Sequence, residues 1–367
     1  MPLADELINA ATAGALAAAF EGATGRPARH LRHAGDALGA LALRPRADLL
    51  RDALLADVPG DYATLASVVR AAVPALQGWM VWPVSTAVAD RAVSDGGTAA
   101  FDDAMALLAE LTGLLTAEFA IRTLLRHDLD RALQTITGWT RSADAAVRRL
   151  ASEGTRPYLP WAVRVPGITT APGVTVGILD ALYDDPDEVV RRSVANHLND
   201  LSRENADLVV AVAQRWLAEP AGDGHTPALV RHALRTLIKR GHPQALALLG
   251  FHPATVRIDG PTLDRKTVEL GDTITFTATI TNDGDHSARL AIDYAVHHRK
   301  ANGSTTAKVF KLTTRVLQPG EAVTVAKEHS LRPITTRRYH PGTHAVDIRV
   351  NGITSAGAEF ELLVGSG

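Results

Sequence analysis

Three similar segments recur at nearly constant spacing in the middle of the chain. Their sequences are VRRLASEG, VRRSVANHLND and VRHALRTLIKRG, and they begin at Val147, Val190 and Val230. The first residues of these segments are 43 and 40 residues apart. A sequence that repeats with such a period predicts a stack of similar structural units, because each unit can bury its apolar face only against its neighbours.

The repeat length is typical of helix pairs of the HEAT type. In the second segment, apolar residues recur at helical spacing between Val190 and Leu201 and form one face. We expect the partner helices of the first two repeats at residues 128–140 and 177–183, and a helix of an earlier, more degenerate unit at residues 116–125.

The hydrophobic pattern changes its period near residue 252. Before this point Ala and Leu recur at helical spacing; beyond it Thr, Val and Ile alternate with polar residues in about seven or eight short runs, with NDGD and QPGE as turns. We therefore expect a mainly α chain. A HEAT-like α-α superhelix of stacked helix pairs would span residues 1–252, and an all-β immunoglobulin-like sandwich without an intersheet disulfide would span residues 253–367.

The composition narrows the possible functions. The chain has no cysteine, which excludes disulfides, thiolate nucleophiles, cysteine-based zinc sites and iron–sulfur clusters. Its net charge of −2 argues against a histone-like polycation but is compatible with a local basic surface. No run reaches the roughly 18 apolar residues of a membrane span. Because Asp5 and Glu6 stand where a secretory signal needs positive charge, we expect a cytoplasmic protein that binds no membrane.

Motifs for metals and nucleotides are absent from the sequence. There is no HExxH, Walker or dinucleotide-binding glycine motif, and the glycine-rich residues 94–98 are interpreted as a loop between helices. The pair His297 and His298 and the pair His340 and His344 lack further ligands at the usual spacing. We therefore expect no metal, no nucleotide cofactor and no other cofactor.

The repeat helices also share polar positions at spacing i and i+4. A solvated outer face is the usual interpretation of such rows, but repeat scaffolds also bind ligands along one face. Glu153 aligns with Asn196 and Thr236, so the acidic character belongs to one unit and indicates a local site. The rows are Arg149 with Glu153, Arg192 with Asn196 and Asp200, and His232 with Thr236 and Arg240.

Several longer segments of the sequence resemble successive blocks of one enzyme family. They are AEFAIR at residues 117–122, RRLASEGTRPYLPW at residues 148–161, VRRSVANHLND, VRHALRTLIKRGHPQALALLGF, and RPITTRRYHPG at residues 332–342. In this order they resemble the AlkC-type DNA alkylation repair glycosylases of the HEAT-like repeat superfamily that includes AlkC and AlkD. The resemblance spans both expected domains, whereas the region before about residue 100 is similar mainly through Trp82–Pro83.

The resemblance implies a DNA glycosylase of base excision repair. Members hydrolyse the N-glycosidic bond of cationic alkylated bases such as 3-methyladenine and 3-methylcytosine in duplex DNA, without flipping the base into a pocket. Carried over to this sequence, the catalytic candidates are Glu118, Glu153 and Asp200, with Trp161 beside them. The implied partner is damaged double-stranded DNA, and we expect the protein to act as a monomer.

Carboxylates suit this reaction for a physical reason. Alkylation at N3 makes the base cationic, so it leaves without a general acid. The sugar then resembles an oxocarbenium ion, which a carboxylate stabilises while it orients or deprotonates the attacking water. A flat aromatic ring such as that of Trp161, placed beside a cationic base, offers it stacking and a cation–π attraction of roughly 1–2 kcal/mol.

Each candidate also has an ordinary structural interpretation. Glu118 is compatible with a solvent-facing position, and Glu153 with an ion pair to Arg149 four residues earlier. Asp200 is compatible with neutralising a helix end near Arg203, and Trp161 is compatible with packing between repeats.

Basic residues indicate where DNA is held. Arg231, Arg235 and Lys239 recur every four residues along one expected helix, which favours either a phosphate contact or a solvated stripe. Between His297 and Tyr339 the sandwich has nine basic residues against Glu321 and Glu328, which suggests that it clamps DNA. The DNA-binding candidates are Arg149, Arg156, Arg192, Asn196, Arg231, Arg235, Lys239, Arg337, Arg338 and Tyr339.

One alternative from another functional class is compatible with the same pattern. It is a non-catalytic HEAT-repeat scaffold that binds DNA or protein and carries the sandwich as an adhesion module. An assay for release of a methylated base distinguishes the two hypotheses.

Overall fold

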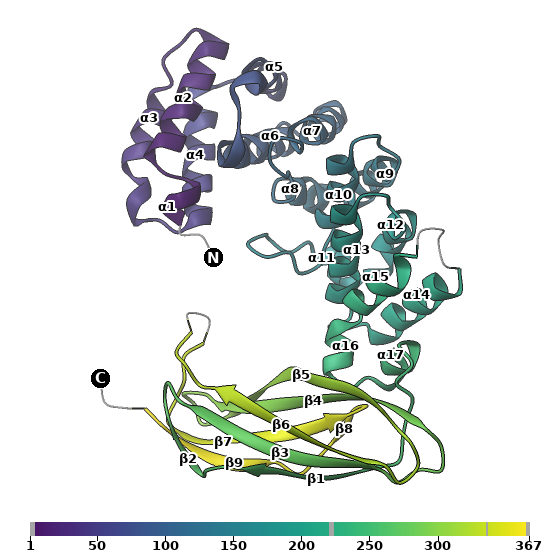
Figure 1. Ribbon diagram of the computed structural model, residues 1–367. Helices are drawn as coiled ribbons and strands as arrows, with labels where there is room; N and C mark the ends of the chain where they lie inside the picture. Colours follow the sequence, from purple (N-terminus) through teal and green to yellow (C-terminus); the bar gives the residue numbers. More distant parts are fainter. Residues whose placement is uncertain (1–3, 220–223, 335–336, 365–367) are drawn as a thin grey trace. The chain divides into compact units, whose positions relative to one another are not determined.

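The computed structural model describes residues 4–219, 224–334 and 337–364, and it divides into two compact units. The first unit comprises residues 1–209 and 215–233, and the second comprises residues 210–214 and 234–367. The first unit is α-helical, and the second consists of short helices followed by β-strands (Figure 1). Within the described ranges, every helix is too short or too polar to span a lipid bilayer.

The N-terminal part of the first unit consists of helices packed around small and branched apolar side chains. Local chemistry fixes several helix ends: Asn9 and Asp61 accept hydrogen bonds from backbone N–H groups at helix starts, and Gly25 and Gly96 end helices in the left-handed conformation. The helices are α1 (Ala4–Leu7), α2 (Ala10–Thr24), α3 (Arg29–Asp36), α4 (Leu43–Asp57), α5 (Tyr62–Ala72), α6 (Val81–Asp95) and α7 (Thr98–Leu111).

The repeats follow, and three of their helices begin at aspartate caps. Asp128, Asp144 and Asp187 each precede a helix and accept a hydrogen bond from a backbone N–H group in its first turn. The helices are α8 (Ile121–His127), α9 (Leu129–Trp139), α10 (Ala145–Glu153), α11 (Pro166–Thr170), α12 (Val176–Leu182), α13 (Glu188–Leu201), α14 (Ala206–Ala218) and α15 (Thr226–Ala233). Helix α10 packs on α13, and α13 packs on α15 (Figure 1). The expected stack of HEAT-like helix pairs is confirmed.

Two local expectations were wrong. The helix expected from residue 116 begins at Ile121, and residues 118–120 form a turn. The segment from Val230 is not one helix, because α15 ends at Ala233 and α16 (Arg235–Lys239) starts after Leu234, whose ψ is 0°. The break leaves the apolar spacing intact because Leu234 and Leu237 are both buried, so the periodicity could not reveal it.

The strands of the second unit follow α16 and α17 (Pro243–Leu248) and form two sheets. One sheet has the order β1-β3-β6, and the other has the order β2-β9-β7-β4-β5 with β8 paired to β7. All pairs are antiparallel except β2 with β9. The strands are β1 (Val256–Leu263), β2 (Thr267–Glu269), β3 (Thr273–Asn282), β4 (Ala288–Arg299), β5 (Thr305–Leu317), β6 (Ala322–Ser330), β7 (Gly342–Val350), β8 (Ile353–Thr354) and β9 (Ala358–Leu363).

The core of this sandwich lies between the two sheets and follows from strand alternation. Phe276 on β3 and Tyr294 on β4 contact each other across the sheets, with ring centroids 5.0 Å apart. The Asn282 side chain donates hydrogen bonds to the carbonyl oxygens of His286 and Leu317, which fixes the NDGD turn between β3 and β4. The alternating residues expected to face inward are buried, namely Ile274, Phe276, Ala278, Ile280, Val346, Ile348 and Val350.

Candidate active site

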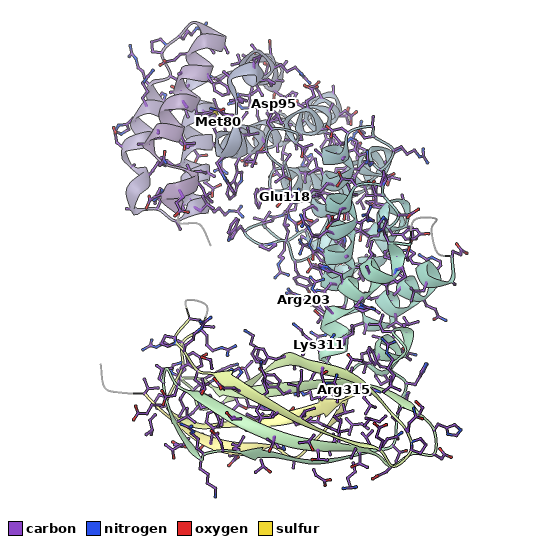
Figure 2. The ribbon with its side chains drawn as sticks, in the orientation of Figure 1. Met80, Asp95, Glu118, Arg203, Lys311 and Arg315 are labelled. Carbon is purple, nitrogen blue, oxygen red and sulfur yellow. The ribbon has the colours of Figure 1, made fainter. Side chains whose placement is uncertain are left out.

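Three carboxylates from successive parts of the helical stack are buried in the first unit. Glu118 lies in the turn before α8 and is labelled in Figure 2, Glu153 is the last residue of α10, and Asp200 lies in the last turn of α13. Their exposed fractions are 8%, 6% and 3%. Because an unpaired buried carboxylate is costly, such a group must be compensated by partners.

Two arginines link the three carboxylates into one chain. The Arg149 Nη2 atom lies 3.0 Å from Glu118 Oε2 and 3.9 Å from Glu153 Oε1. The Arg156 Nη1 atom lies 2.6 Å from Glu153 Oε1, and its Nε atom lies 3.0 Å from Asp200 Oδ2. These ion pairs join three carboxylates to two guanidinium groups, and the buried Arg122 guanidinium also interacts through its charge with Glu118 and Asp200.

Hydroxyl groups complete the partners of two carboxylates. Ser193 Oγ donates to Glu153 Oε2 at 2.6 Å, so both oxygens of Glu153 have protein partners. Thr116 Oγ1 donates to Glu118 Oε2 at 2.8 Å. Burial raises the pKa of Glu118, the Arg149 guanidinium opposes this shift, and the Glu153 carboxylate adds to it. Among the described residues, the side chain of Asp200 is bonded only through Oδ2, by Arg156.

Packing around the carboxylates fixes their positions. The Phe119 ring, next to Glu118, stacks on the buried Trp82 of α6 with centroids 4.3 Å apart. Gly154 follows Glu153 where α8 approaches closely: a Cβ at this position would lie 2.8 Å from Ile121 Cγ2. The Trp82–Pro83 dipeptide of the N-terminal region therefore supports the site from a distance in sequence.

A buried arginine anchors the loop that follows Glu153. Arg122 on α8 is fully buried and donates Nη1 to the carbonyl oxygens of Gly154 and Arg156, both at 2.9 Å. Its Nε atom donates to the carbonyl oxygen of Val163, so one guanidinium binds both ends of the loop. Burial lowers the pKa of Arg122 to about 10, and the charges of Arg164 and Arg156 add to this shift. No role for Arg122 was expected from the sequence, although an arginine among apolar residues in AEFAIR was a usable signal.

Trp161 lies in this loop and is exposed. Its exposed fraction is 45%, and its φ of +62° lies in the left-handed region. The Trp161 carbonyl oxygen accepts a hydrogen bond of 2.8 Å from Arg44 Nη1 on α4. In the same loop, the Tyr158 ring lies between the guanidinium groups of Arg164 and Arg203, which are 4.2 Å and 4.3 Å from its centroid. The core position considered for Trp161 is therefore wrong.

Comparison with known proteins identifies the family. A family model described as DNA alkylation repair enzyme matches residues 115–237, and one described as the C-terminal immunoglobulin-like domain of the uncharacterised protein YhaZ matches residues 257–364. The chain is 31% identical over 323 residues to YhaZ of Bacillus subtilis (strain 168), and 88% of each chain is covered. The Pseudomonas fluorescens alkylpurine DNA glycosylase AlkC, bound to DNA containing an abasic site analog, superposes with a TM-score of 0.88 and 34% identity over 99% of this chain and 100% of that chain. This chain belongs to the AlkC family of DNA alkylation repair enzymes.

The AlkC-family assignment and the fold class expected from the sequence are both confirmed. The two arginines expected to contact DNA near the carboxylates have internal partners in this AlkC-family chain. The Arg156 side chain is 10% exposed between Glu153 and Asp200, and Arg149, at 27%, is paired mainly with Glu118. The proposed ion pair between Arg149 and Glu153 is present but long.

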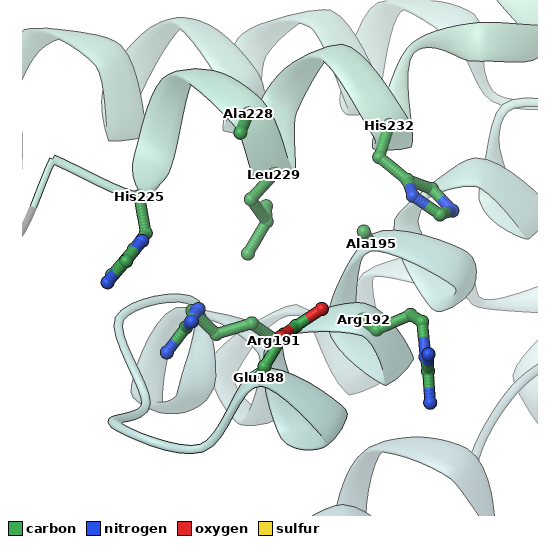
Figure 3. A pocket seen from close by; sticks show the side chains of 8 residues that line it. All are labelled: Glu188, Arg191, Arg192, Ala195, His225, Ala228, Leu229 and His232. Atoms are coloured by element: carbon green, nitrogen blue, oxygen red, sulfur yellow. The ribbon is translucent and has the colours of Figure 1, made fainter.

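Other polar positions of the AlkC-family repeats surround a cavity between α13 and α15 (Figure 3). Its volume is about 330 Å³, and Arg192 and His232 contribute to its lining. His232 Nε2 lies 3.0 Å from Asn196 Oδ1, so the predicted polar rows of neighbouring repeats do meet. The other lining residues are Glu188, Arg191, Ala195, His225, Ala228 and Leu229.

The predicted basic row of α15 is divided by the helix break. Arg231 is exposed at the end of α15 in the first unit, whereas Arg235 and Lys239 lie on α16 in the second. Arg235 is half-buried, and Lys239 is exposed. The three side chains therefore do not lie on one continuous helix, and the expectation of a single stripe is wrong.

The basic segment of the sandwich around Arg337 lies beside buried histidines. The side chain of Arg337 donates to His298 Nε2, and burial lowers the pKa of His298 to about 3, so that ring is neutral and accepts the bond. Tyr339 is half-buried with its ring edge-on to His298, and Arg338 is exposed. Residues 335–336 of TTRRYHPG lie outside the described residues. Lys311 and Arg315 project from β5 (Figure 2).

Metal ligation has no structural candidate in the part of the chain that is described. No group of three or more His, Asp or Glu side chains there has the arrangement of a metal site. His344, one of the histidines considered from the sequence, instead shares a hydrogen bond of 3.0 Å between its Nε2 atom and the carbonyl oxygen of His340.

Proposed function

We propose that this protein is a DNA glycosylase that hydrolyses the N-glycosidic bond of cationic alkylated bases, 3-methyladenine and 3-methylcytosine, in duplex DNA without flipping the base. The observation that carries the proposal is the chain of three buried carboxylates linked by Arg149 and Arg156. The similarity to AlkC, a DNA-bound alkylpurine DNA glycosylase, supports it.

The hydrogen-bond partners of the three carboxylates indicate different roles for them. Both oxygens of Glu153 are bonded, so this residue supplies fixed negative charge at the centre of the cluster. Glu118 and Asp200 each have one oxygen without a hydrogen-bond partner among the described residues. We assign to these two free oxygens the attacking water and the cationic sugar of the transition state.

The two arginines act on the carboxylates and not on the DNA in this proposal. A guanidinium between two carboxylates keeps them ionised and fixes their orientation. Trp161 offers its indole face to the cationic base. Because the leaving base already carries positive charge, no acid is required to protonate it, which fits a monofunctional hydrolase without a metal or another cofactor.

DNA is held by basic and polar side chains elsewhere on the chain. In this proposal, residues 1–252 form the catalytic domain and residues 253–367 form a domain that clamps DNA. The protein acts as a monomer in the cytoplasm. The proposed contacts with phosphate or the grooves are Arg192, Asn196, Arg231, Arg235, Lys239, Arg337, Arg338 and Tyr339.

An excision assay tests the proposal. Purified protein is incubated with an N-methylated duplex, released bases are identified by mass, and alkali then cleaves the abasic sites. We expect free 3-methyladenine and 3-methylcytosine with matching strand breaks, and none from unmethylated duplex. Folded protein that binds the duplex but releases no base would instead favour a non-catalytic scaffold.

A further inference from the structure

Trp161 is held in an unfavourable backbone conformation, and its side chain is partly exposed. Its φ of +62° lies in the region that L-residues with a Cβ rarely adopt. The residue is 45% exposed, so nearly half of it remains accessible to a ligand. Such a conformation persists only where neighbouring contacts determine it, and it is characteristic of functional positions.

The contact nearest to the strained residue comes from a remote helix. Arg122 binds the two ends of the loop, but Arg44 Nη1 binds the carbonyl oxygen of Trp161 itself at 2.8 Å. Arg44 lies on α4, 117 residues earlier in the chain. A peptide group fixed in this way restricts the rotation that would fold the indole back against the protein.

Arg44 makes only one other polar contact among the described residues. Its Nε atom lies 3.7 Å from Asp48, and the two side chains are 42% and 37% exposed. An exposed ion pair of this length contributes little to stability. Removal of Arg44 therefore tests the Trp161 contact without dismantling a core, which removal of the buried Arg122 would do.

We propose that Arg44 is a positioning residue that presents the Trp161 indole to the cationic base. This inference rests on the proposed function, because the base is the group that the indole meets. It makes the N-terminal helices, whose sequence is only loosely similar to the family, contribute to discrimination between cationic and neutral bases.

A double-mutant cycle tests the inference. Single-turnover excision of 3-methyladenine is measured for the wild type, Arg44→Ala, Trp161→Ala and the double variant. We expect Arg44→Ala to slow excision about fivefold, the effect of losing one hydrogen bond of ordinary strength at an exposed position. It should have no further effect in the Trp161→Ala background, because coupled residues are not additive. Equal slowing in both backgrounds would overturn the proposal and indicate an independent contact of Arg44 with DNA.

A conservative variant separates positioning from charge. Arg44→Lys retains the charge and can donate one hydrogen bond to the carbonyl oxygen, so we expect partial recovery of the excision rate. Arg26→Ala removes an exposed arginine from the same unit and serves as the matched control with an unchanged rate. Full recovery of the rate in Arg44→Lys would show that only the charge of this residue matters and would overturn the positioning role.

A second readout does not depend on excision. The chain has five tryptophans. Acrylamide quenching of fluorescence is measured for each protein with Trp161 present and with Trp161→Phe, and the difference gives the contribution of Trp161. We expect Arg44→Ala to change the quenching of this component and Arg26→Ala to leave it unchanged. Absence of excision in the wild type would refute the proposed function alone, whereas unchanged quenching in Arg44→Ala would refute the positioning role alone.

Discussion

The carboxylate cluster of the helical unit and the basic segment of the sandwich use cationic side chains in opposite ways. In the helical unit, Arg149 and Arg156 are paired with carboxylates, and Arg156 is buried. In the sandwich, Lys308, Lys327 and Arg338 are exposed. The first arrangement pairs the cations with carboxylates inside a buried cluster, and the second leaves positive charge at the surface.

This difference shows why a basic residue in a sequence does not by itself indicate a DNA contact. A guanidinium that is paired with two carboxylates attracts a phosphate only weakly, because their charges cancel. An exposed, unneutralised cation keeps its attraction for phosphate. In the proposed function, the carboxylates of the cluster suit a cationic base and sugar, and the positive surface suits the phosphate backbone. Four variants test this division, beginning with the largest expected effect.

The largest effect should come from removing the buried Arg156. Arg156→Met removes the ion-pair partner of the buried Asp200 and leaves Glu153 with only Ser193 and the more distant Arg149. We expect the free energy of unfolding to fall by about 3–5 kcal/mol. Urea denaturation at pH 7 measures this loss. The control is Arg215→Met, which breaks an ion pair whose partners are 48% and 36% exposed and should cost less than about 1 kcal/mol. Equal losses in the two variants would contradict the assigned burial.

Glu153→Gln should next affect chemistry more than binding. The amide keeps the shape of the side chain but removes the fixed charge at the centre of the cluster, so we expect single-turnover excision to slow by more than about tenfold. Affinity for DNA should stay within about twofold, because Glu153 is remote from phosphate in this proposal. Glu110→Gln, at an exposed position paired with Arg70, is the control. Loss of DNA binding would show that Glu153 is structural.

Arg337→Ala tests the basic side of the comparison. If its guanidinium contacts phosphate, the slope of log affinity against log salt concentration should fall by roughly one counterion. Fluorescence anisotropy at several salt concentrations measures this slope. Arg131→Ala, which removes an arginine paired with Asp102 in the helical unit, should leave it unchanged. An unaltered slope for Arg337→Ala removes this residue from the interface.

The smallest expected effect is a displacement of the acid side of the pH profile. Burial raises the pKa of Glu118, so it takes up a proton at higher pH than an ordinary glutamate, whose pKa is about 4.3. Because the ionised form acts in this proposal, excision should decline as pH falls through the raised pKa. Glu118→Gln should have a low rate that lacks this decline. The same pH dependence in wild type and variant would assign the titration to another group.

Local sequence determined much of the fold. The aspartate caps at Asp144 and Asp187, the helical spacing of apolar residues and the alternation from Ile274 to Ile280 each act over a few residues. They predicted the repeat helices and the sandwich, and the resemblance to the family supplied the three carboxylates. The helix break at Leu234 was not predicted, because it changes the backbone without changing the spacing of the apolar residues.

Tertiary structure decided the partners of the site. Arg156 contacts Asp200, which lies 44 positions later in the chain, and Arg44 contacts Trp161, which lies 117 positions later. No local periodicity of the sequence encodes contacts over such separations. The sequence alone determined which residue types were available and which helices and strands would form, because those depend on short-range propensity and spacing. Only packing of the repeats decided which charges are neutralised and which stay free, because burial and Coulomb energy depend on distances in space.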